Sequence, residues 1–197
     1  MLFTELPVLF YTYFAMDKRQ IKTRISLYHA FGECLKEKDY ADVSVEDILR
    51  QSGVSRSTFY AHFKGKDDLL ESISRNIFAH VFSHSLKQES THDFSSDSLF
   101  EYKHLFTHIF YHLRDDKELI KTILSSSCRE VFLEELRKGI GPLVEKVVKD
   151  GIVPYDDIPL PLAILQTRER FVISFVYWFG NDCQESPETM TSYLFFK

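Results

Sequence analysis

The stretch VSVEDILRQSGVSRSTFYAHFKGKDDLL, residues 43–70, decides the fold of this chain. It contains two short segments of helical character, which the tripeptide Ser52-Gly53-Val54 separates. A glycine directly after a short helix supplies the positive φ that a tight turn requires. Two short helices joined by such a turn form a helix-turn-helix, and this is the structure that we predict for the stretch.

Capping residues indicate where each short helix begins. Residues 44–47 (SVED) resemble a capping box in which Asp replaces the usual Glu, so the first helix should begin there. Ser55 should cap the second helix, which should run to about Phe63. Val54, Phe59 and Phe63 would then form the apolar face that holds the second helix against the first.

The opposite edge of the second helix is polar. An arginine can bind guanine or a phosphate through two hydrogen bonds, and hydroxyl and imidazole groups can donate to phosphates or base edges. Lysines at the start of the following helix could contact backbone phosphates. The residues of this predicted DNA-binding surface are Arg56, Ser57, Thr58, Tyr60, His62, Lys64 and Lys66.

The order and spacing of these residues resemble the signature of the TetR (tetracycline repressor) family over about residues 18–75. The matching positions are Gly53-Val54-Ser55, Thr58-Phe59-Tyr60, His62-Phe63, Lys66-Asp67 and Leu69-Leu70. The resemblance implies an all-α fold of about nine helices. It implies a three-helix DNA-binding head at residues 16–66, followed by a connector helix and a helical ligand-binding and dimerisation domain at residues 67–197.

The resemblance also implies roles for the polar residues. The phosphate contacts would be Thr58, Tyr60, His62 and Lys66. Arg56 and Ser57 would contact base edges or the DNA backbone. Ser44 matches a position whose hydroxyl often reaches the DNA backbone. Ser55 is also predicted to contact DNA. Alternatively, Tyr60 and His62 only cover the hydrophobic core.

Composition and charge agree with a helical protein that touches nucleic acid at one end. The chain has 197 residues, of which 44% are hydrophobic and 27% charged, with only 7 Gly and 6 Pro. The net charge of −5 argues against coating nucleic acid by bulk attraction. Residues 16–66 carry ten basic and seven acidic side chains, a net +3, and the remainder of the chain carries −8.

The first fifteen residues, MLFTELPVLFYTYFA, fit no targeting pattern. They lack the positive start of a signal peptide and are shorter than the roughly 20 apolar residues of a membrane span. Because a basic helical start follows Met16, we interpret residues 1–15 as a non-native or disordered extension. The alternative is a native segment that packs on the head. Three widely spaced cysteines without a CxxC pair favour a reduced, cytoplasmic protein.

Apolar periodicity predicts the other helices. They should lie at about residues 18–38, 67–85, 98–114, 116–126, 127–150, 162–181 and 187–196. Gly139-Ile140-Gly141-Pro142 should kink or divide the helix at 127–150. A polar, serine-rich loop at 88–97 should separate the head and connector from the body.

The last two helices are strongly apolar. Large apolar side chains are rarely left exposed in contiguous patches, so these helices favour association of two chains. The TetR resemblance likewise implies a four-helix interface between the last two helices of each chain. The predicted interface residues are Phe175, Trp178, Phe179, Tyr193 and Leu194. The alternative is that these side chains fill the core of a single chain.

The body holds two further candidate sites. An unknown small-molecule effector could bind among aromatic and charged side chains, namely Phe106, His108, Phe110, Arg168, Phe171 and Phe175. A metal ion could bind His104, His108 and His112, which recur every four residues on one helical face. A solvated histidine stripe is the simpler interpretation, so neither a metal nor a cofactor is predicted.

The sequence offers no support for catalysis. It contains no glycine-rich phosphate loop, no GxSxG and no HExxH motif, so we do not predict an enzyme. We predict a homodimeric transcriptional regulator, usually a repressor, that binds a pseudo-palindromic operator in double-stranded DNA, with no membrane attachment. The alternatives are an adaptor or coactivator controlled by a protein partner, and a histidine-based metal sensor.

Overall fold

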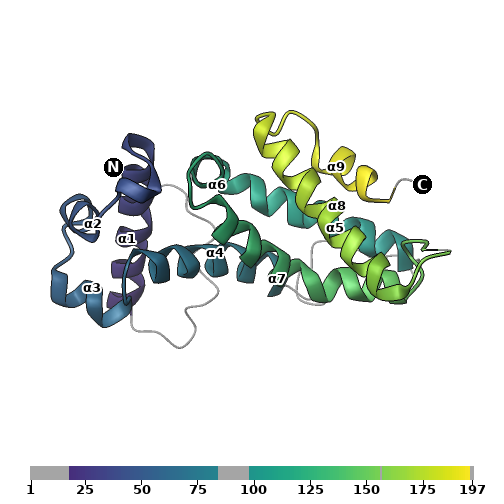
Figure 1. Cartoon of the computed structure of the whole chain (residues 1–197), viewed down its shortest axis with the longest axis horizontal. Helices are drawn as coiled ribbons and strands as arrows, with labels where there is room; N and C mark the ends of the chain where they lie inside the picture. The colour runs from purple at the N-terminus through teal and green to yellow at the C-terminus, as the bar shows by residue number, and fades with distance from the viewer. Residues whose placement is uncertain (1–17, 84–97, 156, 196–197) are drawn as a thin grey trace. The chain divides into compact units, whose positions relative to one another are not determined.

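The structure, a computed structural model, describes residues 18–83, 98–155 and 157–195 (Figure 1). Within these ranges it forms α-helices and one short 3-10 helix, and no strand. The helices are α1 (Lys18–Glu37), η2 (Tyr40–Asp42), α2 (Val45–Ser52), α3 (Arg56–His62), α4 (Lys66–Ser83), α5 (Ser98–Asp115), α6 (Lys117–Leu124), α7 (Arg129–Lys149), α8 (Leu160–Gly180) and α9 (Pro187–Leu194). The prediction of an all-α protein is therefore confirmed. The predictions for residues 1–15 and 88–97 lie outside the described residues.

The predicted helix boundaries agree with the structure to within a few residues, with one difference in α7. This helix continues through Pro142, so the segment Gly139–Pro142 does not divide it. A proline inside a helix costs about 3 kcal/mol. The buried apolar face of α7, formed by Ile140, Val144, Val147 and Val148, offsets that cost because tertiary packing supplies most helical stability.

The described chain forms two compact units, and the first contains the helix-turn-helix. It comprises the residues through His80 together with Glu118–Glu135, so α6 and the start of α7 pack with the head. Within it α2 packs on α1 (Figure 1). The rings of Phe78 and Phe132 lie 4.9 Å apart and join α4 to α7. Fully buried side chains of its core include Leu27, Phe31, Ile48, Phe59, Leu69 and Leu70.

The second unit, residues 81–117 and 136–197, is built around aromatic side chains. α9 packs on both α5 and α8. The ring of Phe110 lies 5.5 Å from that of Phe171 and 5.2 Å from that of Trp178. The indole N–H of Trp178 donates to the carbonyl of Glu185 at 2.8 Å, so the one polar atom of this buried ring is satisfied.

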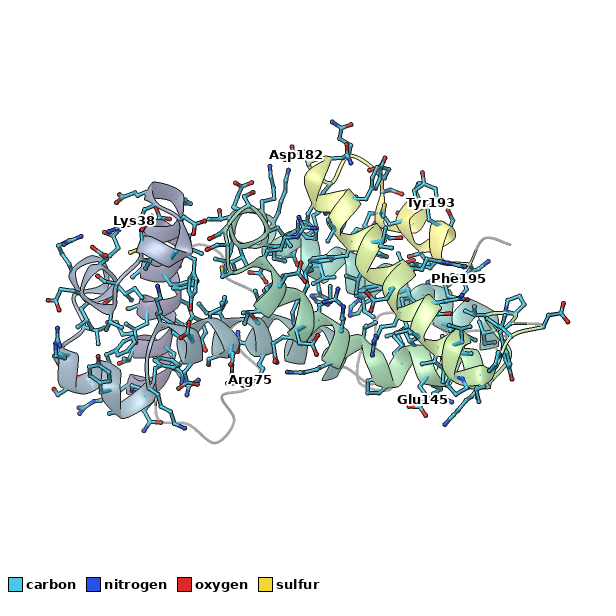
Figure 2. All side chains as sticks on the ribbon, in the orientation of Figure 1. Lys38, Arg75, Glu145, Asp182, Tyr193 and Phe195 are labelled. Atoms are coloured by element: carbon cyan, nitrogen blue, oxygen red, sulfur yellow. The ribbon has the colours of Figure 1, made fainter. Side chains whose placement is uncertain are left out.

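This core corrects the predicted dimer interface. Phe175, Trp178, Phe179 and Leu194 are at most 4% exposed within their own chain. A side chain enclosed by its own unit offers no surface to a second chain, so the structure favours the alternative that these residues fill the core. Tyr193 differs, because it is 43% exposed on α9 (Figure 2).

The described part of the chain contains no helix with both the length and the apolar character needed to cross a bilayer. Cys34, Cys128 and Cys183 form no disulfide bond with one another, and the first two are buried.

Candidate nucleic-acid interface

The first helix of the motif, α2, begins with the predicted capping box. The hydroxyl of Ser44 accepts from the N–H of Asp47 at 3.2 Å, and the N–H of Ser44 donates to the Asp47 carboxylate at 3.0 Å. Lys38 and Arg50 pair with the same carboxylate at 2.8 and 2.7 Å. Hydrogen bonds from Lys38 and Ser44 hold the pKa of Asp47 far below its usual range. Ser44 is thus committed to the start of α2.

The turn of the motif depends on a glycine. Gly53 has φ 67°, in the left-handed region, and its N–H donates to the carbonyl of Leu49 at 3.0 Å. A side chain would be strained in this conformation. Ser55 then caps α3 by accepting from the N–H of Thr58 at 3.2 Å. The predicted helix-turn-helix is confirmed.

Aromatic packing fixes the orientation of α3. Phe59 is fully buried, Phe63 is 2% exposed, and their rings lie 5.8 Å apart. The ring of Phe63 also lies 6.4 Å from that of Tyr28 on α1, and the guanidinium of Arg24 covers it at 5.0 Å. No sequence motif pointed to Arg24, whose nitrogen Nη1 also donates to the hydroxyl of Ser72 at 3.1 Å.

The opposite edge of α3 is open. Tyr60 is 50% exposed, Arg56 and Ser57 are exposed, and Thr58 is half-buried. The hydroxyl of Ser55 lies 3.0 Å from that of Ser57 and 2.8 Å from that of Thr58. This edge therefore presents a cluster of hydroxyl groups beside a tyrosine and an arginine, a set of groups suited to phosphates and base edges.

Arg56 has a partner that the sequence analysis missed. Its guanidinium pairs with the carboxylate of Glu46 on α2, and both side chains are 65% exposed. An exposed ion pair of this kind is worth about 0–1 kcal/mol. A guanine or a phosphate can therefore replace Glu46 at little cost.

Lys66 has a role within the fold. Its ammonium donates to the carbonyls of Tyr40, Ala41 and Val43 at 2.7, 3.3 and 2.8 Å, and lies 4.5 Å from the centre of the Tyr40 ring. These bonds occupy the donors of the ammonium. In this conformation Lys66 holds η2 against the start of α4 and does not offer a free cation to a phosphate.

The remaining predicted contacts lie at the end of α3. Lys64 is exposed, and its backbone N–H donates to the carboxylate of Asp68 at 3.0 Å. His62 is half-buried, and burial together with the charge of Arg24 lowers the pKa of the imidazole. At neutral pH His62 would therefore act as a neutral hydrogen-bond donor.

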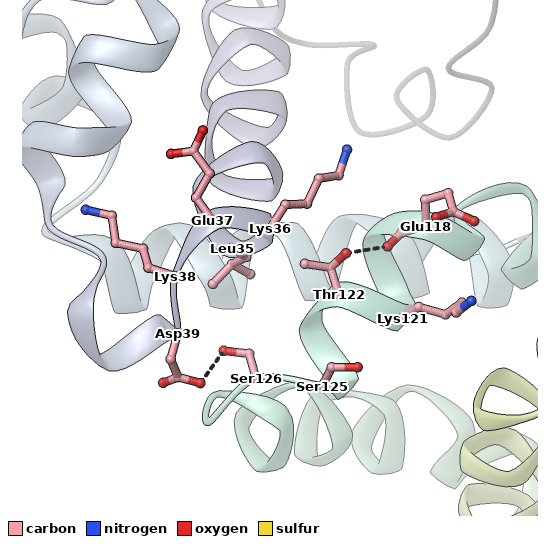
Figure 3. Close-up of a pocket in the computed structure, with 10 residues that line it drawn as sticks. All are labelled: Leu35, Lys36, Glu37, Lys38, Asp39, Glu118, Lys121, Thr122, Ser125 and Ser126. Atoms are coloured by element: carbon pink, nitrogen blue, oxygen red, sulfur yellow. Dashed lines mark hydrogen bonds between the residues drawn. The ribbon is translucent and has the colours of Figure 1, made fainter.

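The turn between α1 and η2 is bonded to the turn between α6 and α7. The carboxylate of Asp39 accepts from the hydroxyl of Ser126 at 3.3 Å (Figure 3). It also accepts from the N–H of Ser127 at 2.9 Å and from the hydroxyl of Ser127. The N–H of Tyr40 donates to the hydroxyl of Ser126 at 3.0 Å. The Ser127 hydroxyl is the main cause that lowers the pKa of Asp39 to about 2.

A polar cavity of about 550 Å³ adjoins this contact, lined by α1, α6 and the two turns (Figure 3). Its walls carry both charges: Lys36, Lys38 and Lys121 face it together with Glu37, Asp39 and Glu118. Lys36 and Lys38 are paired with Glu33 and Asp47 at 2.6 and 2.8 Å, respectively. The cavity therefore has no marked preference for an anion or a cation.

The residues predicted to bind an effector are only partly brought together. The ring of Phe171 lies 5.9 Å from that of Phe106, and the ring of Phe175 lies 4.6 Å from that of Phe179, so these buried rings fill the core. Arg168 pairs with Glu169 at 3.3 Å. The described residues contain no group of three or more side chains arranged to hold a metal ion.

Comparison with known proteins agrees with this geometry. Residues 27–73 match the family described as bacterial regulatory proteins, tetR family, and residues 101–195 match a family described as transcriptional regulator C-terminal region. A TetR transcriptional regulator from Streptococcus agalactiae has a similar structure, with a TM-score of 0.70 and 24% sequence identity over 91% of this chain and 94% of that one. Thermus thermophilus FadR, a repressor solved with lauroyl-CoA, gives a TM-score of 0.54 at 15% identity over 87% of this chain and 90% of that one.

Curated relatives match part of the chain. YxbF, an uncharacterised HTH-type transcriptional regulator of Bacillus subtilis, is 37% identical over 81 residues, which are 41% of this chain and 21% of YxbF. DhaS, the dhaKLM operon transcriptional activator of Lactococcus lactis, is 31% identical over 71 residues, which are 36% of this chain and 38% of DhaS. The matches thus span well under half of these relatives. With both family regions matched and the helix-turn-helix in place, the chain belongs to the TetR family of helix-turn-helix transcriptional regulators.

Proposed function

We propose that this TetR-family regulator binds a pseudo-palindromic operator as a homodimer and represses transcription until an effector binds its C-terminal domain. The open edge of α3 carries the proposal, because Tyr60 is 50% exposed there beside Arg56 and the hydroxyls of Ser57 and Thr58. In a symmetric dimer two such helices enter successive major grooves, roughly 34 Å apart. In this proposal residues 16–66 contact DNA, and residues 67–197 dimerise and bind the effector.

The contact assignment predicts distinct effects for two variants. We expect Arg56→Ala to relax base preference, at a cost of about 1–3 kcal/mol for the preferred operator if the guanidinium contacts guanine. We expect Tyr60→Phe to weaken binding similarly for all sequences, because a phosphate contact carries no sequence information. DNA-fragment selection with purified protein, followed by affinity measurement at a fixed salt concentration, tests both.

A matched control is Lys149→Ala, which removes one exposed cation from α7 while leaving the head unchanged. Its affinity and base preference should equal those of the wild type. Wild-type binding in both Arg56→Ala and Tyr60→Phe would contradict the assignment of α3 as the recognition helix.

An exposed apolar stripe on α8 supports the dimer. Leu162, Leu165, Ile173 and Tyr177 are 41%, 45%, 67% and 48% exposed, respectively. With Glu169 between them, their spacing of three or four residues places them on one face of the helix, opposite the buried Phe171 and Phe175. Tyr193 adds an exposed ring on α9. We propose that this stripe, in place of the buried residues predicted from the sequence, contacts the second chain.

Ile173→Asp should therefore dissociate the dimer. Burying an unpaired carboxylate in an apolar interface is unfavourable, and we expect the dimer to weaken by about 100-fold or more. Sedimentation equilibrium measures this effect. The control is Val131→Asp, which introduces the same charge at an apolar position of α7 that is 42% exposed. Equal dissociation by both variants, or by neither, would argue against the α8 stripe.

The effector proposal rests on the family and on the aromatic second unit. The FadR structure contains lauroyl-CoA, so a fold of this type can hold a ligand that carries a long apolar acyl chain. An effector must bind the released conformation more tightly than the DNA-bound one, or it cannot shift the equilibrium. Screening apolar acyl compounds for release of a labelled operator tests the proposal, and operator binding that no screened compound alters would count against it.

A second candidate function is activation. The relative DhaS, which is 31% identical to this chain over the matched 71 residues, is named a transcriptional activator. A reporter gene controlled by the selected operator distinguishes repression from activation. Deleting the regulator raises expression if it is a repressor and lowers expression if it is an activator.

A further inference from the structure

Two histidines on α5 lie unusually close together. The Nε2 atoms of His108 and His112 share a hydrogen bond of 2.8 Å, and the two rings lie 4.2 Å apart at an angle of 86°. Both side chains are half-buried. Because the residues are separated by one helical turn, the backbone of α5 holds both rings on the same face.

This geometry is close to that of a chelating pair. Nitrogen–metal bonds of about 2.0–2.1 Å with angles between square and tetrahedral place two ligand nitrogens about 2.9–3.4 Å apart. The two Nε2 atoms therefore need to separate by only about half an ångström to bind the same ion. That adjustment lies within small rotations of the two rings.

A carboxylate stands behind one of the rings. The Nδ1 atom of His112 lies 4.0 Å from a carboxylate oxygen of Asp115. At that distance the carboxylate accepts no hydrogen bond from Nδ1, so it acts on the ring only through its charge. The two Nε2 atoms share one proton in their hydrogen bond, and a metal ion bound by both atoms would displace that proton.

We propose that His108 and His112 form a two-histidine site for a divalent late transition-metal ion such as Zn²⁺ or Ni²⁺. Imidazole nitrogens suit these ions, whereas Mg²⁺ and Ca²⁺ need several oxygen ligands. The described residues offer no third metal-ligating side chain in the same group, so water completes the coordination shell. Such a site is open and exchangeable. The inference does not depend on DNA binding by the head.

The ion would also stiffen the end of α5. His112 lies in the last turn of this helix, and the chain enters α6 at Lys117. A cross-link between His108 and His112 holds those final turns helical, because both ligands must keep their spacing while the ion is bound.

The test is isothermal titration calorimetry of ZnCl₂ into the full chain after chelator treatment. We expect one ion per chain and at least a 100-fold loss of affinity in His108→Gln and in His112→Gln. Asp115→Asn, which removes only the charge of a carboxylate 4.0 Å from the ring, should lose less than 10-fold. The control is His29→Gln, an exposed histidine on α1, which should bind as tightly as the wild type.

A second measurement keeps the test independent of how well the variants fold. In the wild type, ZnCl₂ should slow the modification of His108 and His112 by diethyl pyrocarbonate, located by mass spectrometry, and leave His29 unaffected. Absence of heat, unchanged affinity in His112→Gln, equal loss in His29→Gln, or no selective protection would each overturn the proposal.

Discussion

Replacing Trp178 with alanine is expected to lower the free energy of unfolding by about 3–5 kcal/mol. Trp178 is fully buried, and its ring lies 5.2 Å from that of Phe110 and 5.5 Å from that of Phe179. The substitution leaves a large cavity and removes the donor to the carbonyl of Glu185. Urea denaturation at a fixed protein concentration measures the loss, since the stability of a dimer depends on concentration.

Two controls separate a core role from an interface role. Trp178→Phe retains most of the apolar volume and should lose about 1–3 kcal/mol, chiefly through the unsatisfied carbonyl. Tyr193→Ala removes an exposed ring of the same unit and should leave the stability of the isolated chain within about 0.5 kcal/mol. A folded, fully stable but monomeric Trp178→Ala protein would restore the interface assignment made from the sequence.

The second large effect is a gain of stability. Asp116→Asn is expected to stabilise the protein at pH 8 by about 2–4 kcal/mol. Asp116 is 9% exposed and one of its carboxylate oxygens, Oδ2, has no hydrogen-bond partner. Burial, with a smaller contribution from the charge of Asp115, raises the pKa of Asp116 to about 7. Asparagine has a similar shape and remains a good residue directly before α6, but it carries no charge to bury.

The pH dependence of the free energy of unfolding shows why Asp116→Asn should stabilise the protein. The unfolded chain ionises Asp116 near its ordinary pKa of about 3.9, whereas the folded chain holds the proton until about pH 7. The contribution of Asp116 to the free energy of unfolding is therefore most favourable below pH 4. It declines between pH 4 and 7 and is constant above pH 7. Asp116→Asn should lack this decline.

Chemical denaturation at several pH values measures the difference between the two proteins. The pKa of Asp39, about 2, is depressed, so that residue acts with the opposite sign and in a lower window, between about pH 4 and 2. It therefore does not obscure the result. Asp157→Asn makes the same substitution at an exposed position and is the control. Parallel profiles of the wild type and Asp116→Asn between pH 4 and 7 would show that burial does not raise the pKa of Asp116.

The helix-turn-helix could be predicted from the sequence because its signals are local. The capping box at Ser44 and Asp47, the glycine at position 53 and the apolar Phe59 and Phe63 lie within about twenty residues, and each specifies a backbone geometry or a buried face. Because the caps, the glycine and the apolar positions all indicate the same local structure, the motif can be predicted from the sequence.

The partners of the site residues could not be predicted in the same way. Lys66 bonds to carbonyls more than twenty positions earlier in the chain, and Glu46 pairs with Arg56 across the turn. A charged residue in a sequence does not disclose whether its partner is a phosphate or its own backbone. Only the tertiary structure distinguishes the two.

α8 shows a different limit. Apolar side chains cover most of its circumference, with Phe171 and Phe175 on the buried side and Ile173 and Tyr177 on the exposed side. Periodicity identifies the buried face of a helix that has one apolar face. When apolar side chains surround nearly the whole helix, periodicity cannot tell which of them face the core and which face a second chain. The sequence therefore predicted an apolar helix correctly, whereas the residues that it predicted for a dimer interface are buried within their own chain.

The bonds from Asp39 to Ser126 and Ser127 have a mechanical consequence. They are short-ranged and share one carboxylate, and a hydrogen bond is lost once donor and acceptor separate beyond about 3.5 Å. A displacement of the α6–α7 turn by a few tenths of an ångström would therefore break the bond from Ser126, and a displacement of about an ångström would also break the bond from the N–H of Ser127. The turn that precedes the helix-turn-helix is thus sensitive to small movements of the end of α6.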